Sequence, residues 1–480
     1  MSIRRSIGYT AFLVALTGLW GCSSGDGAKS APAPLDSGDT NLVFVVSPDL
    51  AFGGAGDVDP RTGNLTSQGL QRSLAMASFL KEEVLGGANV TSILALEPMT
   101  HLQTAGAYPD MNGIGYIQQF AMLNQITLSG TTAYSYPIAV AYGAHSVPAG
   151  VAEPSSFDGV TTGLAFGAEG GDNLELARRI LHARLPGFFV LSAPWETTSA
   201  LLAGIVDAES YSLHAPTAYA GPNAVFAISV SPAGRAELTR YDAPLDPIAS
   251  YPALPEPIPP AACDQQPPFA IQRAAGVDGA AVPVGMNTTS TVYLMRHVEA
   301  HPGGEGWEDG NYVGTGQWRS LALPDVMRDK IAPDEVWSID PAQSFGVGDF
   351  NLFSYVRPSL TVWPYTIATG LPYKLAASFP LGAADDPNAA QATIDFFFKG
   401  GALSGKKALL VWEHAHFPPL VEALVASYGG TAPAPSLDWP GTDYDTIWTV
   451  TLDATGNLSV DNGLCEGIDT SGFPDAPPMF

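Results

Sequence analysis

Residues 291–302 read TVYLMRHVEAHP, and the interpretation of the whole chain begins from this stretch. Its first five residues are apolar, β-branched or aromatic, which is typical of a buried β-strand. The strand signal ends abruptly in Arg296-His297, with Glu299 two residues further on. Only 21 of the 480 residues are Lys or Arg, so we asked which other residues the chain places around this pair.

The same succession of elements occurs twice along the chain. Each half opens with a strand signal, NLVFVV at 41–46 and STVYLM at 290–295. A helix signal, a strand followed by a helix start, and an apolar strand leading into an apolar helix come next, at 65–84, 91–105 and 187–206 in the first half and at 314–329, 334–368 and 407–426 in the second. Alternating strands and helices are typical of α/β folds. We therefore expect a tandem duplication that gives two three-layer α/β/α domains, each a mostly parallel sheet with helices on both faces.

A segment rich in proline and glycine separates the two halves and suggests the domain boundaries. Residues 251–285 are interpreted as a linker or a covering strap. The expected divisions are a lipoprotein-type signal peptide at 1–21, a flexible tether at 22–40, a first domain at 41–250, the linker at 251–285, a second domain at 286–460 and a C-terminal tail at 461–480.

The N-terminus has the features of an export signal. Arg4 and Arg5 precede an apolar stretch of about a dozen residues, which is too short to span a bilayer. The stretch LWGC at 19–22 resembles a bacterial lipobox, which implies that Cys22 becomes the lipidated N-terminus. An ordinary secretory signal with an incidental cysteine is the alternative. We expect an exported protein of the bacterial cell envelope, in the outer membrane or periplasm, that is lipid-anchored and has no transmembrane helix in its mature form.

The composition limits the partners that the chain can have. It has 47 acidic against 21 basic residues, a formal net charge of −26. Because a phosphate backbone needs a basic surface, nucleic acid is not expected as a partner. A small anionic substrate requires local basic residues that overcome the acidic surroundings.

Two cysteines remain after Cys22. In an exported protein such a pair usually forms a disulfide, which here would join Cys263 in the linker to Cys465 in the tail. Two free thiols are the alternative. Neither cysteine has a second Cys or a His at zinc-ligand spacing, so no metal site is expected.

The second half places basic and imidazole side chains at several strand or helix ends. Arg296 and His297 follow one strand, Arg357 begins a predicted helix, and His414 follows the strand KALLVW. Ligands of open α/β sheets bind at the carboxyl ends of the strands. Arginine matches phosphate oxygens, and a neutral histidine is a nucleophile toward phosphorus. The four side chains supply the charge that a phosphoryl group requires, so we expect no cofactor.

These residues carry a resemblance to a known family. LMRHVEA resembles the LxRHGEx signature of the histidine phosphatase superfamily, also called the phosphoglycerate mutase-like or RHG family. Further segments are similar to its later motifs, in the same order: GTGQWRSLALP, YVRPSLTVWP, LLVWEHAHFPPLVEAL and, as a closing strand, DWPGTDYDTIWTVTL. The likeness covers residues 286–455.

The resemblance implies a role for each of the four residues. His297 would be the phosphorylated nucleophile, Arg296 and Arg357 would bind the phosphoryl group, and His414 would complete the pocket. The chain departs from the family pattern at Val298, which replaces the signature glycine and puts the width of the pocket in doubt.

The proton donor for the leaving group cannot be assigned from the sequence. Glu413 is adjacent to the second histidine of the pattern. Asp385 and Asp386 lie between the third and fourth motifs, and each is more simply interpreted as a solvated loop carboxylate.

The first half lacks the same chemistry. At the corresponding positions the sequence has Ser47-Pro48 in place of the Arg-His pair, Thr100 in place of the second arginine and Pro194 in place of the second histidine. We therefore expect a phosphatase-like fold without catalysis in this half.

The function predicted from the sequence is hydrolysis of a small phosphomonoester through a phosphohistidine on His297. Mutase activity is less favoured, because an exported enzyme has little access to glycolytic intermediates. The alternative from another class is a catalytically silent, surface-anchored binding or scaffold protein built from two phosphatase-like domains. A serine hydrolase is not supported, since the chain has no G-x-S-x-G elbow.

Overall fold

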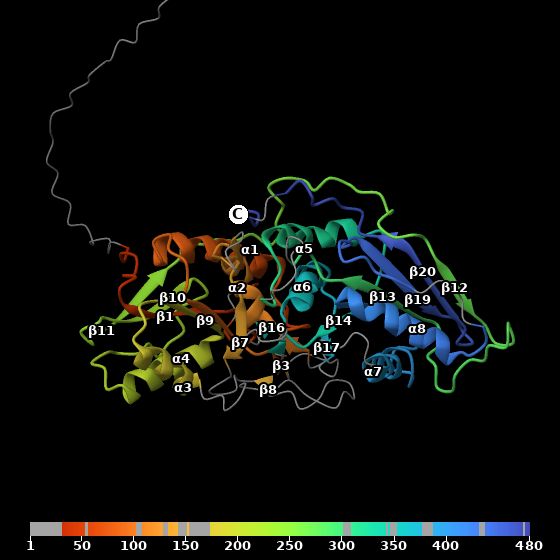
Figure 1. Ribbon diagram of the computed structural model, residues 1–480. Helices are drawn as coiled ribbons and strands as arrows, with labels where there is room; N and C mark the ends of the chain where they lie inside the picture. Colours follow the sequence, from red (N-terminus) through yellow and green to blue (C-terminus); the bar gives the residue numbers. More distant parts are fainter. Residues whose placement is uncertain are drawn as a thin grey trace, which may run out of the picture. The chain divides into compact units, whose positions relative to one another are not determined.

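The computed structural model in Figure 1 describes most of the chain. The described residues are 31–52, 56–101, 108–127, 133–142, 151–152, 173–300, 309–341, 344–345, 353–376, 387–431, 437–473 and 476–480. Residues 33–480 form one compact unit. The predicted signal peptide with Cys22, and the carboxylates Asp385 and Asp386, lie outside the described residues. Within the described ranges, no helix has both the length and the apolar character needed to cross a membrane.

The first half contains a six-stranded sheet with the order β11-β10-β1-β9-β2-β7. Its main elements are β1 Thr40–Val46, α1 Ser67–Phe79, β2 Ser92–Leu96, α2 Asn112–Met122, β7 Ile138–Tyr142, α3 Asn173–Ala183, β9 Gly187–Ala193, α4 Trp195–Ala208, β10 Ala224–Val230 and β11 Ala236–Asp242. The central strands β1, β9, β2 and β7 pair in parallel, and β10 and β11 extend the sheet antiparallel.

The second half contains a seven-stranded sheet with the order β12-β20-β19-β13-β18-β14-β17. Its main elements are β12 Ala270–Arg273, β13 Ser290–Arg296, α5 Gly314–Met327, β14 Glu335–Ile339, α6 Arg357–Thr369, β17 Tyr373–Ala376, α7 Pro387–Phe397, β18 Lys407–Trp412, α8 Phe417–Ser427, β19 Thr446–Leu452 and β20 Leu458–Cys465. β13, β18, β14 and β17 pair in parallel, and the three remaining strands are antiparallel. The predicted α/β fold with two helix-flanked sheets is confirmed.

Short strands and turns of helix complete the described elements. They are the π-helical turn Leu80–Val84, the 3₁₀ turn His414–His416, β3 Met99–His101, β4 Pro109–Asp110, β5 Gln125–Thr127, β6 Ala133–Ser135, β8 Val151–Ala152, β15 Ser344–Phe345 and β16 Phe353–Ser354.

The central strand of each sheet is buried on both faces, which explains its continuous apolar sequence. Successive side chains of a strand point to opposite faces. In β13, Tyr293 and Met295 therefore pack in one core with residues of α5 and α6, while Val292 and Leu294 pack in another with residues of α8. β1 is built in the same way, with its two faces in separate cores.

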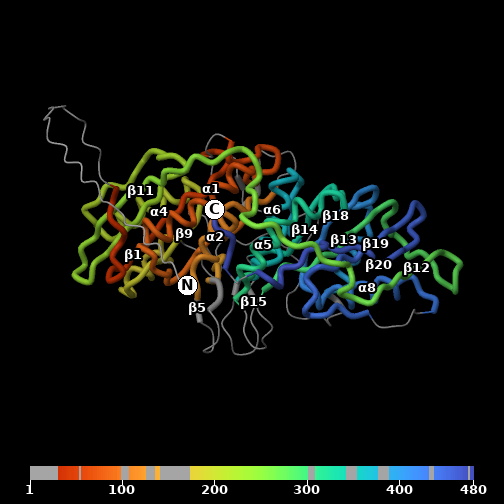
Figure 2. Tube along the Cα trace, turned by 90° about the horizontal axis from the view of Figure 1, so that it is seen from above, coloured from red at the N-terminus to blue at the C-terminus, as the bar shows by residue number. Residues whose placement is uncertain are grey.

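The two halves share one hydrophobic core, which includes residues of α1, α2, α5 and α6. Helices α2 and α6 approach so closely that a Cβ on Gly115 would lie 2.4 Å from the Trp363 ring. The amides of Gln118 and Asn311 exchange hydrogen bonds of 2.9 and 3.1 Å across the same contact. Figure 2 shows these helices between the two sheets. The division into separate domains remains a prediction.

Three segments differ from the sequence-based expectation. Thr100, in the stretch where a helix start was expected, lies in β3, and the next described helix starts at Asn112. The linker is part of the second sheet, because β12 pairs antiparallel with β20, which runs into the expected tail. The end of the tether also packs on the body, where the Leu35 amide donates to the Val84 carbonyl at 2.9 Å.

Candidate active site

His297 lies directly after β13, where its backbone amide donates to the Trp412 carbonyl of β18 at 2.9 Å. The residue is 1% exposed. Its Nδ1 lies 2.7 Å from the Val298 carbonyl oxygen, which can only accept a hydrogen bond. Nδ1 therefore carries the proton, and Nε2 has the free lone pair that a nucleophile requires.

The electrostatic surroundings keep His297 neutral. Burial lowers the pKa of the imidazole well below its usual value, and the charges of Arg296 and Arg357 lower the pKa further. Glu413 and the Val298 carbonyl oppose this shift in pKa but do not cancel it. The imidazole is thus uncharged at neutral pH, with its single proton on Nδ1.

Arg296 is 3% exposed and is held by the loop before β19. Its Nη1 donates to the carbonyls of Gly441 at 2.6 Å and Asp443 at 3.2 Å. Its guanidinium lies 3.9 Å from the centre of the Tyr444 ring. Among the residues that the structure describes, nothing accepts a hydrogen bond from its buried Nε. Such a buried donor is expected to have a partner, and an oxyanion would supply one.

Arg357 enters the same site from the first position of α6, where Pro358 favours the helix start. It is 2% exposed, and its Nη2 lies 3.9 Å from the Asp309 carboxylate. Thr361 connects this helix to the histidine loop, because its hydroxyl donates to the Arg357 carbonyl at 2.8 Å and accepts from the Val298 amide at 3.1 Å.

His414 is in the 3₁₀ turn between β18 and α8, close to the loop before β19 that holds Arg296. Its Nε2 would lie 3.7 Å from a Cβ on Gly441. Its Nδ1 forms an ion pair with Glu413, whose other oxygen lies 3.6 Å from Nδ1 of His416. Burial raises the pKa of Glu413, but hydrogen bonds from His414 and His416 bring the pKa well below its usual value.

Val298 does not face the predicted pocket. It is fully buried and belongs to the core shared by α5 and α6. Its Cγ2 lies 2.9 Å from the position of a Cβ on Gly316, so the side chain is directed toward α5. The glycine-to-valine departure thus adds apolar packing behind the histidine loop.

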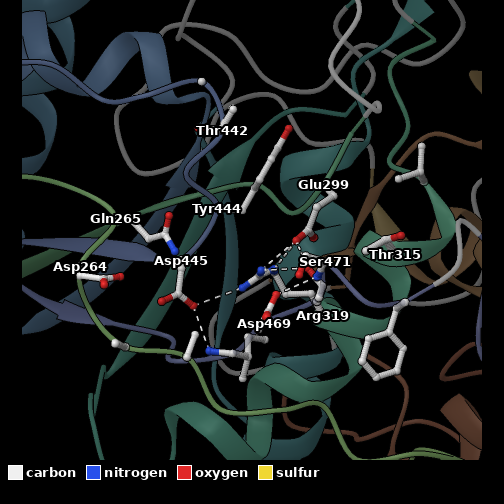
Figure 3. A pocket seen from close by; sticks show the side chains of 17 residues that line it. Asp264, Gln265, Glu299, Thr315, Arg319, Thr442, Tyr444, Asp445, Asp469 and Ser471 are labelled. Atoms are coloured by element: carbon white, nitrogen blue, oxygen red, sulfur yellow. Dashed lines mark hydrogen bonds and ion pairs between the residues drawn. The ribbon is translucent and has the colours of Figure 1, made fainter.

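A cleft of about 970 Å³ adjoins this site, and Figure 3 shows its lining side chains. It does not include His297, but it shares the Gly441–Tyr444 loop with Arg296. Arg319 of α5 lies in its wall and pairs with Glu299 at 2.8 Å and with Glu466 at 2.7 Å. Glu299 is thus held in an ion pair with Arg319.

The corresponding edge of the first sheet shows that the sequence register was off by one. The Ser47 amide donates to the Ala193 carbonyl, as the His297 amide donates to Trp412. By this register Val46-Ser47 corresponds to the Arg-His pair, and Trp195, two residues after Ala193, corresponds to the second histidine. Asn112 begins α2 where the second arginine begins α6. None of these four residues is an arginine or a histidine.

Cys263 and Cys465 form a disulfide with a Cα–Cα distance of 5.5 Å. It joins the segment before β12 to the end of β20. The residues that follow Cys465 line the cleft together with residues that flank Cys263, so the disulfide fixes one wall of it.

All four candidate residues lie at one edge of the second sheet, although they come from three distant segments. The sequence did not reveal Tyr444, which covers Arg296, Asp309, which faces Arg357, or the cleft itself. Tyr444 is in the quoted segment DWPGTDYDTIWTVTL, but no spacing rule links it to the Arg-His pair.

Comparison with known proteins gives matches only at the level of structure. No family model and no curated protein matches the chain. Solved structures that it is similar to include members of the histidine phosphatase superfamily. The protein histidine phosphatase SixA complexed with tungstate has 22% identity and a TM-score of 0.24, and covers 37% of this chain and 97% of its own. Phosphoglycerate mutase from Plasmodium falciparum has 13% identity and a TM-score of 0.22, with 38% and 94% covered. At such TM-scores the likeness has no bearing on substrate or mechanism.

Proposed function

We propose that this protein hydrolyses a small phosphomonoester through a covalent phosphohistidine on His297. The observation that carries the proposal is the juxtaposition of a buried, neutral imidazole, with its Nε2 lone pair available, and the two buried guanidinium groups of Arg296 and Arg357. A phosphate monoester placed there would meet both a nucleophile and fixed positive charge.

The reaction would take place in two steps. In the first, Nε2 of His297 attacks phosphorus, the new P–N bond forms, the P–O bond to the alcohol breaks, and the departing oxygen takes a proton from solvent. In the second, water attacks phosphorus and gives a proton to solvent, the P–N bond breaks, and phosphate leaves while Nε2 regains its lone pair. Arg296 and Arg357 stabilise the charge on the equatorial oxygens in both steps. The low pKa of Glu413 makes this carboxylate a poor proton donor at neutral pH.

The remaining parts of the proposal concern location and the first half. The N-terminal sequence supports export and lipid attachment at Cys22, and the disulfide is of a kind that persists in oxidising compartments. The same order of strands and helices in the two halves supports a tandem duplication. Val46, Ser47, Asn112 and Trp195 at the equivalent edge support a first half without catalysis.

The test is hydrolysis of an aryl phosphate by the wild-type protein and by a His297→Asn variant. We expect turnover by the wild type and a loss of about 10³-fold or more in the variant, since the nucleophile is removed. Quenching a reaction with labelled substrate in alkaline detergent should trap an acid-labile, alkali-stable phosphate on the wild type alone. His182→Asn is the matched control, because this side chain is 55% exposed in the first half. Equal rates in wild type and His297→Asn would instead support the silent binding protein.

A further inference from the structure

The cleft beside the reaction site is acidic, in contrast to the site itself. Its lining contains four carboxylates and one cation: Asp264, Glu299, Asp445, Asp469 and Arg319. The cation does not balance the wall, because Arg319 already pairs with Glu299 and with Asp445 at 3.4 Å, and it also donates a hydrogen bond to the buried Glu466.

Two carboxylate oxygens of the lining residues lack a hydrogen-bond donor within the described part of the chain, Oδ2 of Asp445 and Oε2 of Glu299. Asp445 is 2% exposed, and its Oδ1 accepts hydrogen bonds from the amides of Gly467 at 2.9 Å and Ile468 at 3.1 Å. Its Oδ2 has no hydrogen-bond donor within the described part of the chain. In Figure 3 one oxygen of this carboxylate is joined to Arg319, and the other is turned away. A buried carboxylate oxygen of this kind is costly unless a donor reaches it.

The cleft and the reaction site share a wall. The Gly441 carbonyl holds Arg296, and Tyr444 covers the guanidinium of Arg296 while also lining the cleft. The Tyr444 ring is 6.2 Å from the His297 ring. A molecule with its phosphate near His297 could therefore extend past this loop toward Asp445.

We propose that the substrate is a phosphomonoester with an ammonium group at its far end, which the Asp445 side of the cleft binds. This inference rests on the proposed function, and it specifies the substrate class. An ammonium group supplies the three donors that the carboxylates require. A metal ion fits less well, since the described residues contain no cluster of three or more His, Cys, Asp or Glu side chains suited to one.

The test compares aminobutyl phosphate with pentyl phosphate, which has the same length but no charge at its far end. We expect the wild type to prefer the amine in kcat/KM by about 10- to 100-fold, the range of one charge-assisted hydrogen bond. Binding of both compounds to His297→Asn, measured by calorimetry, should show the same preference without turnover. High salt should reduce this preference for the amine, because salt screens the exposed carboxylates Asp264 and Asp469.

Asp445→Asn should reduce the preference for the amine. The double variant Asp264→Asn/Asp469→Asn tests the two exposed carboxylates of the cleft without changing a buried group. Asp395→Asn is the control, since this exposed carboxylate of α7 pairs with Lys399, four residues along the same helix. Turnover without any preference for the amine would overturn the inference and leave the proposed function standing. If the amine were preferred in binding but the wild type showed no turnover, the result would support the inference and overturn the proposed hydrolase. Equal binding of both compounds in calorimetry would overturn the inference in either case.

Discussion

The Val298 carbonyl, a backbone group, determines which nitrogen of His297 carries the proton. The pair of arginines then acts on an imidazole whose orientation is already set. The surroundings of His297 are positively charged, whereas carboxylates outnumber the single cation around Arg319. The acidic surroundings of Arg319 lead to a prediction about the pH dependence of stability.

Glu466 is fully buried next to Arg319, and burial raises its pKa to about 8, with the Asp445 and Glu299 charges adding to the rise and Arg319 opposing it. The folded state thus keeps a proton on this carboxyl at pH values where the unfolded chain has released it. The free energy of unfolding should fall as pH rises from about 4.5 to about 8.

Glu466→Gln removes this titration. Relative to the wild type, the variant should gain stability as pH rises from about 5 to 8, by at most about 1.4 kcal/mol per pH unit. Urea denaturation at several pH values measures the difference. A stability difference that stays constant over this range would show that Glu466 does not titrate there.

At the scale of elements, α5 and α1 are built on the same close contact. A Cβ on Gly316 would lie 2.6 Å from the Glu299 carbonyl oxygen, and a Cβ on Gly69 would lie 2.3 Å from the Asp57 carbonyl oxygen. Each glycine lies three positions before the first residue of the sequence Arg-Ser-Leu-Ala, which occurs at 72–75 and 319–322. Helix α5 therefore packs directly on the segment that follows β13, and helix α1 packs directly on the segment that follows β1.

Gly316→Ala should destabilise the protein by about 1–3 kcal/mol, because the added methyl group forces backbone apart. It should also lower activity, since the displaced Glu299 carbonyl is two residues from His297. Gly69→Ala should cost similar stability but spare activity in the folded protein. Gly204→Ala in α4 is the control: its Cβ would make only ordinary contacts of 3.5 Å, and a gain of about 0.5–1 kcal/mol in stability is expected. Thermal unfolding and aryl phosphate turnover measure these effects, and equal activity in all three variants would contradict this account.

At the scale of the whole molecule, the two halves bury helices in one shared hydrophobic core. Trp363 of α6 is 3% exposed and lies against Gly115 of α2 in the shared core. The reciprocal amide pair of Gln118 and Asn311 joins the two halves in the same region. The first half thus supports the helix that begins with Arg357.

Trp363→Ala should therefore weaken both halves, at a cost of about 3–5 kcal/mol. Hydrogen exchange of the amides in β9 and β18 measures each sheet separately. Protection should fall in both strands, because the cavity lies in the core that both sheets share. If β9 kept full protection while β18 lost it, the halves would be independent folding units.

The sequence alone determined the parts of the protein that depend on local patterns. The continuous apolar run before Arg296, the strand before Glu413 and the proline next to Arg357 are local signals, and the corresponding elements form where they were expected. The order of strands and helices then indicates an α/β sheet, whose carboxyl edge gathers these residues.

The tertiary structure decided what depends on contacts between distant segments. Ile271 pairs with Val460, and Asn112 is held by Pro48 and Gly63, so neither the edge strand β12 nor the start of α2 is a property of its own residues. The acidic cleft likewise forms only where the linker, the Gly441–Tyr444 loop and the residues after β20 meet. The physical reason is that side-chain periodicity encodes burial, whereas the partner against which a residue is buried is set by packing across the whole fold.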